Sequence, residues 1–258
     1  MNIAIIGGGN MGGALAVGLA RKADEAGLQI TVTARTQATL ERLKGEAPNL
    51  VTTRLNAEAV RLADIVVLAV KPWLIEGVIN VVKPALREQI VCSLAAGIGT
   101  QQLAEWLERP AFYCMPNIAA RVAESITFIA PPAGASEEAT EQVRQLFALV
   151  GQVMVCEERL LAPGMMMGGC GIAYVMRYLR AQTEGGVEMG FPAHQALAIA
   201  MQTMQGAISL LRATGMHPEA AIDQVTTPGG TTIKGLNALD HAGFNSAVIQ
   251  SLKAGLKG

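Results

Sequence analysis

Short apolar runs alternate with segments of helical spacing through the first 157 residues of the chain. The runs lack the polar alternation of half-exposed strands, so they predict strands buried on both faces of a mostly parallel sheet. A helical segment follows most runs, which predicts right-handed crossovers and a doubly wound α/β fold. The expected strands are 2–6, 30–34, 50–53, 65–70, 90–94, 111–114, 125–130 and 152–155. The expected helices are 11–25, 37–46, 57–62, 75–86, 100–107 and 137–150.

The strand pattern stops near residue 158, and the rest of the chain has helical spacing only. These later helices are rich in Ala, Met, Gln and Leu, and no Gly-rich or Ser-rich linker precedes them. We therefore expect two domains, an α/β domain over residues 1–157 and an all-helical domain over residues 158–258. The expected helices of the second domain are 172–189, 193–214 and 232–241.

The charge and composition indicate which kinds of molecule the chain is expected to bind. The 258 residues carry 20 Lys and Arg against 21 Asp and Glu, a formal net charge of −1. A nucleic-acid binder neutralises phosphates with a basic face, so we expect no nucleic-acid partner. Hydrophobic residues make up 51% of the chain and charged residues only 16%. This surplus of apolar residues predicts a large core and some apolar surface that is covered between subunits of a homo-oligomer.

No segment of the sequence has the pattern of a membrane span. The longest apolar runs, such as 65–70 and 90–96, are far shorter than the ~20 residues that cross a bilayer. The first residues lack the basic segment and small-residue cleavage site of a secretory signal. We therefore expect a cytoplasmic protein with no membrane partner.

The cysteines and histidines are not spaced as metal ligands. We expect the cysteines to be reduced, small apolar residues, and we expect no metal site. The residues concerned are Cys92, Cys114, Cys156 and Cys170 together with His194, His217 and His241.

A glycine-rich loop follows the first expected strand and opens the first expected helix. Its sequence, Gly7-Gly8-Gly9-Asn10-Met11-Gly12, matches the G-x-G-x-x-G pattern in the strand–turn–helix context that gives the pattern meaning. The first glycine allows the tight turn, the second lets a pyrophosphate approach the backbone, and the third lets the helix lie close to the strand. The helix N-terminus adds free N–H groups for the phosphates. The motif predicts that this domain binds a dinucleotide.

The end of the second expected strand bears on the choice of dinucleotide. NAD-specific sites place an acidic residue there to bind the ribose 2′-hydroxyl, ~20 residues after the glycine loop. This chain has Ala34, followed by Arg35 and Thr36. A guanidinium and a hydroxyl suit a 2′-phosphate, so we expect NADP(H) to be preferred, with NAD(H) as the alternative. A solvated surface arginine is the competing interpretation of Arg35.

Two further strands end in residues that suit a nicotinamide ring. The run Asp64–Val70 ends in Lys71-Pro72, and the run Ile90–Leu94 ends in Ala95, Ala96 and Gly97. Ligands of doubly wound folds bind at the carboxyl ends of the strands. The small side chains at these ends predict room for a planar ring.

A second helix N-terminus lies in the helical half of the chain. Pro228-Gly229-Gly230 predicts a turn, and Thr231-Thr232 then open a helix. Its N–H groups and two hydroxyls could bind a carboxylate. An ordinary helix start is the alternative when the segment is considered alone.

Together, these segments resemble the pyrroline-5-carboxylate reductase family over nearly the whole chain. The last of the matching segments is close to the family's signature, whereas the glycine loop is shared with many dehydrogenases. The matching segments are IIGGGNMGGAL (5–15), ADIVVLAVKP (63–72), SLAAGI (93–98), MPN (115–117), GGVEMGF (185–191) and VTTPGGTTIKGLNALD (225–240).

The resemblance implies an N-terminal Rossmann-type domain followed by an all-helical oligomerisation domain. It implies that NAD(P)H reduces the C=N bond of 1-pyrroline-5-carboxylate to L-proline, the last step of proline biosynthesis. It also implies an interlocked dimer, often assembled further into a decamer. A cyclic imine is readily protonated and accepts hydride easily, so positioning would be the enzyme's main task.

Site residues follow from the resemblance position by position. Gly7, Gly9, Asn10, Met11 and Gly12 match the cofactor loop, Arg35 and Thr36 the adenosine 2′-group position, and Asn56 the asparagine on the adenosine side. Ala69, Lys71, Pro72, Ala95 and Ala96 match positions that line the nicotinamide half. Gly230, Thr231 and Thr232 match the loop that binds the substrate carboxylate, with Thr232 near the ring nitrogen as the expected catalytic residue.

The chain departs from the family pattern over residues 162–172. The family has Ser-Gly-Ser-Gly-Pro-Ala-Tyr where this chain has Gly168-Gly169-Cys170-Gly171-Ile172-Ala173-Tyr174. Ala162 and Met165 replace an aspartate and a threonine that the family often has. Two alternatives therefore stay open. One is a related reductase for another cyclic imine or small imino or keto acid, and the other is a non-enzymatic oligomer that binds NADP(H).

Overall fold

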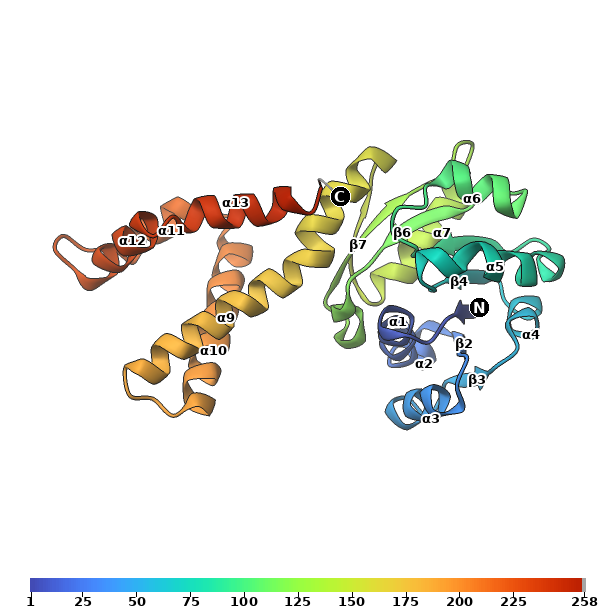
Figure 1. Cartoon of the computed structure of the whole chain (residues 1–258), viewed down its shortest axis with the longest axis horizontal. Coiled ribbons are helices and arrows are strands. Elements are labelled where there is room, and N and C mark those ends of the chain that lie inside the picture. The colour runs from blue at the N-terminus through green and yellow to red at the C-terminus, as the bar shows by residue number, and fades with distance from the viewer. Residues whose placement is uncertain (257–258) are drawn as a thin grey trace. The chain divides into compact units, whose positions relative to one another are not determined.

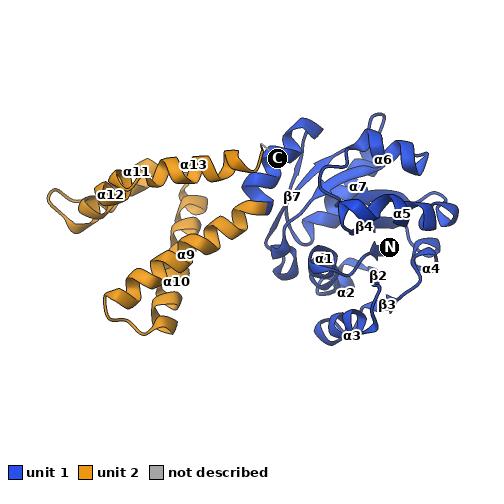
Figure 2. Cartoon of the chain, in the orientation of Figure 1, with its two compact units in different colours: residues 1–169 blue, residues 170–258 orange. Residues whose placement is uncertain are grey.

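The computed structural model describes residues 1–256 as two compact units. Unit 1 covers residues 1–169 and unit 2 begins at Cys170 (Figure 2). The domain boundary expected after residue 157 falls inside unit 1, and as a boundary between functional domains it stays a prediction. Within residues 1–256, every helix is too short or too polar to span a bilayer.

Unit 1 contains one eight-stranded sheet with the strand order β3-β2-β1-β4-β5-β6-β7-β8. The strands from β1 to β6 pair in parallel, β7 runs antiparallel to β6, and β8 runs parallel to β7. The predicted doubly wound, mostly parallel sheet is confirmed. The strands are β1 (Asn2–Ile6), β2 (Gln29–Thr33), β3 (Val51–Thr53), β4 (Ile65–Leu68), β5 (Ile90–Ser93), β6 (Phe112–Met115), β7 (Ser125–Ala130) and β8 (Gly151–Val155).

Helices cover both faces of the sheet because its central strands are apolar on both faces. Ile3 and Ile5 of β1 point into one core, and Ala4 and Ile6 point into the other. The first core is closed by α1 (Asn10–Ala20), α2 (Ala23–Ala26), α3 (Gln37–Glu46) and α7 (Glu137–Ala148). The second is closed by α4 (Asn56–Arg61), α5 (Pro72–Val82), α6 (Thr100–Leu107) and α8 (Leu161–Gly164).

Several boundaries differ from those expected. The helix expected over 11–25 is two helices, because the chain leaves α1 at Arg21 before α2 begins. The helix expected from residue 75 begins at Pro72, because proline fits the first turn of a helix, where its missing N–H has no partner to lose. The strand expected to end at residue 70 ends at Leu68, which leaves Ala69 and Val70 in the loop.

The sequence did not predict the short segments that follow β8. They are a 3₁₀ turn (Glu158–Leu160), α8 and a π-helical segment (Met165–Cys170). Added Cβ atoms at Gly164 and Gly168 would lie 2.8 Å from side-chain carbons of Phe128 and Ile126, so both glycines allow these segments to approach β7 closely. The side-chain amide of Asn117 donates a hydrogen bond of 3.0 Å to the carbonyl oxygen of Gly168.

Unit 2 is entirely helical in the part that the structure describes, as expected. Helices α9 and α10 form a hairpin (Figure 1), and Tyr178 of α9 meets Phe244 of α13 edge to face at 6.2 Å. Two of its helices, α11 and α13, were not expected. The helices are α9 (Gly171–Glu188), α10 (Ala193–Thr214), α11 (Pro218–Gln224), α12 (Thr231–His241) and α13 (Phe244–Ala254).

Unit 2 has little core of its own. Over residues 170–256 the only buried residues are Gly186, Ala196 and Ala200. Large apolar side chains on α9, α10 and α13 are exposed instead, among them Val175, Met176, Leu197, Ile199, Ile208 and Ile249.

The contact between α1 and the segment Ile118–Val122 provides a test of the packing in the first core of unit 1. A Cβ atom at Gly18 would lie 1.9 Å from the backbone carbonyl oxygen of Ala120. Gly18→Ala should therefore destabilise unit 1 by about 1–3 kcal/mol through overpacking. The control is Gly45→Ala, because nothing lies within 4 Å of a Cβ atom there and alanine favours the helix. The measurement is the midpoint of urea unfolding at one protein concentration. Equal midpoints for the two variants would contradict the close packing of Gly18 on Ala120.

Candidate functional site

The glycine loop has a shape that only glycine allows at two positions. Gly7 has φ +111°, and an added Cβ atom would lie 2.7 Å from the carbonyl oxygen of Ala69. A Cβ atom at Gly12 would lie 2.0 Å from the carbonyl oxygen of Gly7. The loop is also tied to β2, because the N–H of Gly8 donates to the carbonyl oxygen of Thr33 at 2.6 Å. The start of α1 is therefore held against the ends of β1 and β4.

Gly9 differs from Gly7 and Gly12 because the space that a Cβ atom would occupy is empty. Nothing lies within 4 Å of a Cβ atom added there, and the φ of Gly9, −70°, would suit any residue. Neither packing nor backbone conformation therefore requires glycine at this position. Gly9 is the N-cap of α1, no side chain caps the helix, and the first turn carries no acidic residue. The open space and the free N–H groups together fit a pyrophosphate, as the motif predicts.

Arg35 and Thr36 follow β2 at the same edge of the sheet. Arg35 is exposed and takes part in no salt bridge among residues 1–256. The hydroxyl of Thr36 is the N-cap of α3 and accepts a hydrogen bond of 3.4 Å from the N–H of Thr39. Arg35 is therefore available to bind a ligand, whereas the hydroxyl of Thr36 already caps α3.

The structure adds Arg54, which the sequence analysis did not single out. Thr33 and Thr53 are register partners in β2 and β3, and the N–H of Ala34 donates to the carbonyl oxygen of Thr53 at 3.4 Å. Arg54 therefore follows β3 beside the segment that carries Arg35, and it is exposed. Parallel pairing of two expected strands is the signal that could have found it. Asn56 begins α4 just beyond.

The end of β4 supplies the next group of expected residues. The N–H of Ala69 donates to the carbonyl oxygen of Ile6 at 2.8 Å, which places Ala69 beside the glycine loop. Lys71 is exposed, and its Nζ atom lies 5.9 Å from the centre of the Trp73 ring. Pro72 is half-buried in the first turn of α5.

The loop after β5 carries Ala95 and Ala96. Ala95 is buried and its N–H donates to the hydroxyl of Ser93 at 3.2 Å, whereas Ala96 is exposed. Gly97 follows with φ +80°, and its N–H donates to the hydroxyl of Tyr113 at 2.8 Å. Tyr113 was also missed by the sequence analysis, because its contact with this loop depends on the pairing of β5 with β6.

The expected cofactor residues therefore lie along one edge of the sheet in unit 1. They follow the carboxyl ends of β1, β2, β3, β4 and β5, which is where doubly wound folds bind their ligands. Whether each of them contacts a cofactor stays a prediction.

The expected substrate loop belongs to unit 2. Gly230 donates its N–H to the carbonyl oxygen of Thr227 at 2.9 Å, and Gly229 has φ +73°, so the predicted turn at Pro228 is present. Gly230 is the N-cap of α12 and no side chain caps that helix. Thr231 and Thr232 are exposed in its first turn, so their N–H groups and hydroxyls are available for an anion.

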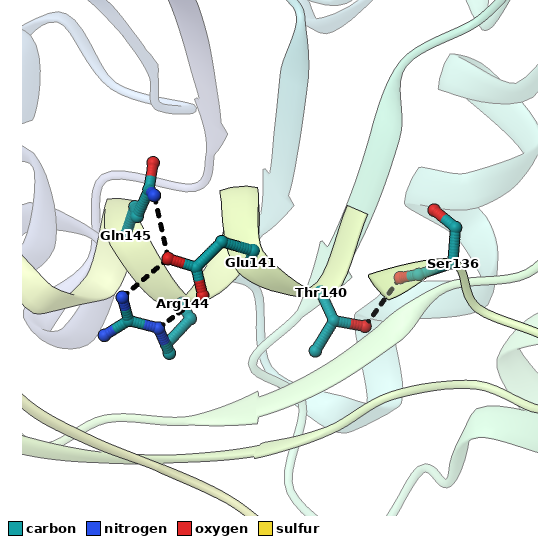
Figure 3. Close-up of polar contacts among 5 residues, drawn as sticks. All are labelled: Ser136, Thr140, Glu141, Arg144 and Gln145. Atoms are coloured by element: carbon teal, nitrogen blue, oxygen red, sulfur yellow. Dashed lines mark hydrogen bonds and ion pairs between the residues drawn. The ribbon is translucent and has the colours of Figure 1, made fainter. Parts of the chain in front are cut away.

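A hollow elsewhere in unit 1 is a poor candidate for the site. It lies at the carboxyl ends of β7 and β8, which run opposite to β6, so it faces away from the carboxyl ends of β1 and β4. One of its two acidic residues, Glu141, accepts two hydrogen bonds of 2.6 Å from Arg144 and one of 2.8 Å from Gln145 (Figure 3). These partners lower the pKa of Glu141 to about 2 and neutralise its charge.

The thiols and histidines form no evident chemical centre in residues 1–256. No group of three or more His, Cys, Asp or Glu side chains in that range could hold a metal ion. Burial raises the pKa of the Cys114 thiol well above its usual value and also raises that of Cys156, so both thiols stay protonated and unreactive.

Comparisons with known proteins match both parts of the chain. A family model described as pyrroline-5-carboxylate reductase dimerisation matches residues 158–257, and one described as NADP oxidoreductase, coenzyme F420-dependent, matches residues 2–97. The pyrroline-5-carboxylate reductase of Pisum sativum is 32% identical, over 99% of this chain and 93% of that protein. Pyrroline-5-carboxylate reductase 1 of Dictyostelium discoideum is 36% identical over 97% of this chain, which spans only 48% of that longer protein.

The structure also resembles a solved pyrroline carboxylate reductase. The Plasmodium falciparum pyrroline carboxylate reductase, solved with NADP bound, superposes with a TM-score of 0.89 and 24% identity, over 100% of this chain and 96% of that one.

The open direction at Gly9 gives a test of the cofactor loop. Gly9→Ala should fold normally, because its backbone suits alanine, but its methyl group would occupy the space expected for the pyrophosphate. We expect NADPH affinity to fall at least tenfold, since a lost charge-assisted contact is worth ~1.5–3 kcal/mol, and the Tm to fall only slightly, since alanine is a poorer N-cap than glycine. Gly77→Ala, at an open position in α5, is the matched control. Equal NADPH affinity of the two variants in a fluorescence titration would contradict the assignment.

Proposed function

Because the chain belongs to the pyrroline-5-carboxylate reductase family, we propose that it reduces the C=N bond of 1-pyrroline-5-carboxylate to L-proline. The reaction is the last step of proline biosynthesis. The observation that carries the proposal is the presence, in one chain, of both a dinucleotide loop and the turn at Pro228 that opens α12.

The nicotinamide cofactor fits the glycine loop of unit 1. Gly7, Gly9, Asn10, Met11 and Gly12 would hold the pyrophosphate, and Asn56 the adenosine side. Ala69, Lys71, Pro72, Ala95 and Ala96 would line the nicotinamide half. When bound, the cofactor supplies the hydride, and the protein's task is to orient it and to exclude water.

NADPH is the donor that the adenosine end favours. No carboxylate follows β2, and Arg35 and Arg54 stand on adjacent strand ends with no salt-bridge partner among residues 1–256. Two guanidinium groups suit the doubly charged 2′-phosphate, which NADH lacks. Thr36 supports this end through the cap it provides to α3.

The substrate carboxylate would bind the free N–H groups of Gly230, Thr231 and Thr232 at the start of α12. The Thr232 hydroxyl would hydrogen-bond the ring nitrogen. A threonine hydroxyl is too weak an acid to be the sole proton source, so the imine is protonated by solvent. This leaves the positioning of the imine carbon as the main contribution of the loop.

The chain works as a homo-oligomer through its dimerisation domain. The exposed apolar side chains of α9, α10 and α13 form a surface that a second copy can cover. An interlocked dimer, and its assembly into a decamer, are part of the proposal. The cytoplasmic location expected from the sequence stays a prediction.

One experiment tests the function. NADPH oxidation is followed with 1-pyrroline-5-carboxylate, and the product is identified as L-proline by chromatography. A higher kcat/KM with another cyclic imine or a small keto acid would favour the first alternative, which the departures over residues 162–172 motivate. Tight NADPH binding without turnover of any imine would favour the non-enzymatic oligomer.

The cofactor preference gives a second test. Arg35→Asp should lower kcat/KM for NADPH about 10- to 100-fold, because it replaces a phosphate partner with a like charge. The value for NADH should change less than about threefold, since NADH has no 2′-phosphate. Arg61→Asp, at the far end of α4, is the control. A wild-type kcat/KM that is higher with NADH would contradict the preference.

Thr232 gives a third test. Thr232→Ala removes a hydrogen bond to a charged iminium, which is worth ~1.5–3 kcal/mol, so kcat/KM for the imine should fall roughly 10- to 150-fold. The Kd for NADPH should stay the same, because the cofactor loop belongs to unit 1. Thr140→Ala, which also removes an exposed hydroxyl, is the control. An unchanged kcat/KM, or a loss that weaker NADPH binding fully explains, would remove Thr232 from the site.

A further inference from the structure

The loop of residues 95–99, between β5 and α6, has few interactions of its own that would fix its conformation. Two of its residues are glycines, and Gly97 has φ +80°. Its internal backbone bond, from the N–H of Ile98 to the carbonyl oxygen of Ala95, is long at 3.3 Å. Yet this loop carries Ala95 and Ala96, which we place beside the nicotinamide ring. Other parts of the chain must therefore determine its conformation.

Tyr113 is the first of these parts. Its ring is buried in the core beneath α5 and α6, only 5% exposed, so its position is determined by packing. Its hydroxyl accepts a hydrogen bond of 2.8 Å from the N–H of Gly97, the residue with the left-handed backbone. Burial, together with the nearby Glu158 carboxylate, raises the pKa of Tyr113, so the phenol stays neutral near pH 7.

Glu158 is the second part, and it acts on the other end of the loop. Its carboxylate accepts hydrogen bonds from the N–H of Thr100 at 3.2 Å and from the Thr100 hydroxyl at 2.5 Å. It thereby caps α6, whose N-cap, Gly99, has no side chain to do so. A Cβ atom at Gly99 would lie 2.2 Å from Oε1 of Glu158, so a larger residue there would require this carboxylate to shift.

Both contacts come from distant parts of the sequence and meet at the loop. Glu157 and Arg159 pair with each other, so the carboxylate of Glu158 stands apart from that ion pair. Glu158 is also the first residue that the dimerisation family model matches. The contacts thus tie the loop to the core on one side and to the segment that leads toward unit 2 on the other.

We propose that Tyr113 and Glu158 are positioning residues that hold the 95–99 loop against the nicotinamide ring and so set the geometry of hydride transfer. The proposal rests on the proposed function, because it takes the edge of the sheet after β5 as the nicotinamide half of the cofactor site. Neither side chain needs to touch the cofactor. Both act through the backbone of Gly97 and Thr100.

The test uses Tyr113→Phe and Glu158→Ala in the full chain, with Glu158→Gln as the conservative variant. Tyr113→Phe keeps the buried ring and removes only the hydroxyl that Gly97 needs. Glu158→Gln keeps one oxygen that can accept from Thr100, so it should restore most of what Glu158→Ala loses. Glu157→Gln is the matched control, because the Glu157 side chain is paired with Arg159.

Three measurements separate positioning from general stability. Amide hydrogen exchange of a peptide covering residues 95–100 should rise in both disruptive variants. The single-turnover rate of NADPH oxidation at saturating imine should fall about tenfold, since small misplacements at a reacting centre carry large rate effects. Affinity for NADPH should weaken a few fold, whereas affinity for adenosine 2′,5′-bisphosphate, which lacks the nicotinamide half, should stay the same.

Two results would overturn the proposal. One is faster exchange of the loop with a single-turnover rate within about twofold of wild type, which would leave the contacts only a structural role. The other is an equal loss of affinity for NADPH and for adenosine 2′,5′-bisphosphate, which would mean that the whole domain is disturbed. If the wild-type chain reduced no imine, the proposed function would fail. Hydrogen exchange and the two affinities would still decide whether Tyr113 and Glu158 order the nicotinamide half.

Discussion

The close approach of α1 to the ends of β1 and β4 is the constraint on which the rest of the structure depends. A Cβ atom at Gly12 would overlap the carbonyl oxygen of Gly7, so the helix begins where it does only because both residues are glycine. That approach leaves the N-terminus of α1 open at Gly9 and directed at the edge where the other strands end. The proposed phosphate site and the proposed position of the cofactor follow from this one contact.

The sheet then limits where chemistry can take place. Its central strands are buried on both faces, so the residues that we propose for the cofactor come from the loops at the strand ends. Those loops are short and rich in small residues, and hydrogen bonds to neighbouring elements hold them in place. Gly8 is bound to Thr33, Gly97 to Tyr113, and Thr100 to Glu158. Each bond links a loop at the sheet edge, or the helix that follows it, to another element.

The sequence predicts well what depends on local pattern. The strands of unit 1, the glycine loop and the turn at Pro228 each follow from residues that are close together in the chain. Arg54, Tyr113 and Glu158 could not be found in the same way. Arg54 comes beside the Arg35 segment through the register of β2 and β3, and Glu158 reaches Thr100 across 58 positions of sequence. Such contacts depend on tertiary pairing, which no short motif encodes.

The helical segments that were missed have a related cause. The π-helical segment Met165–Cys170 carries no periodic apolar pattern. It is held instead by Asn117 and by close packing of Gly168 on β7. Helix α13 has apolar residues, but many of them face solvent in a single chain, so one chain has no core that would explain them.

This last feature links assembly to the turn that we propose as the substrate loop. Over residues 170–256 only Gly186, Ala196 and Ala200 are buried, which is far too little apolar burial to offset the conformational entropy of ordering five helices. The stability of unit 2 must therefore come mainly from surface that a second copy covers through the dimerisation domain. The turn that presents Gly230 and Thr232 belongs to that unit. The turn itself is formed within one chain, but the helices that carry it depend on association for their stability.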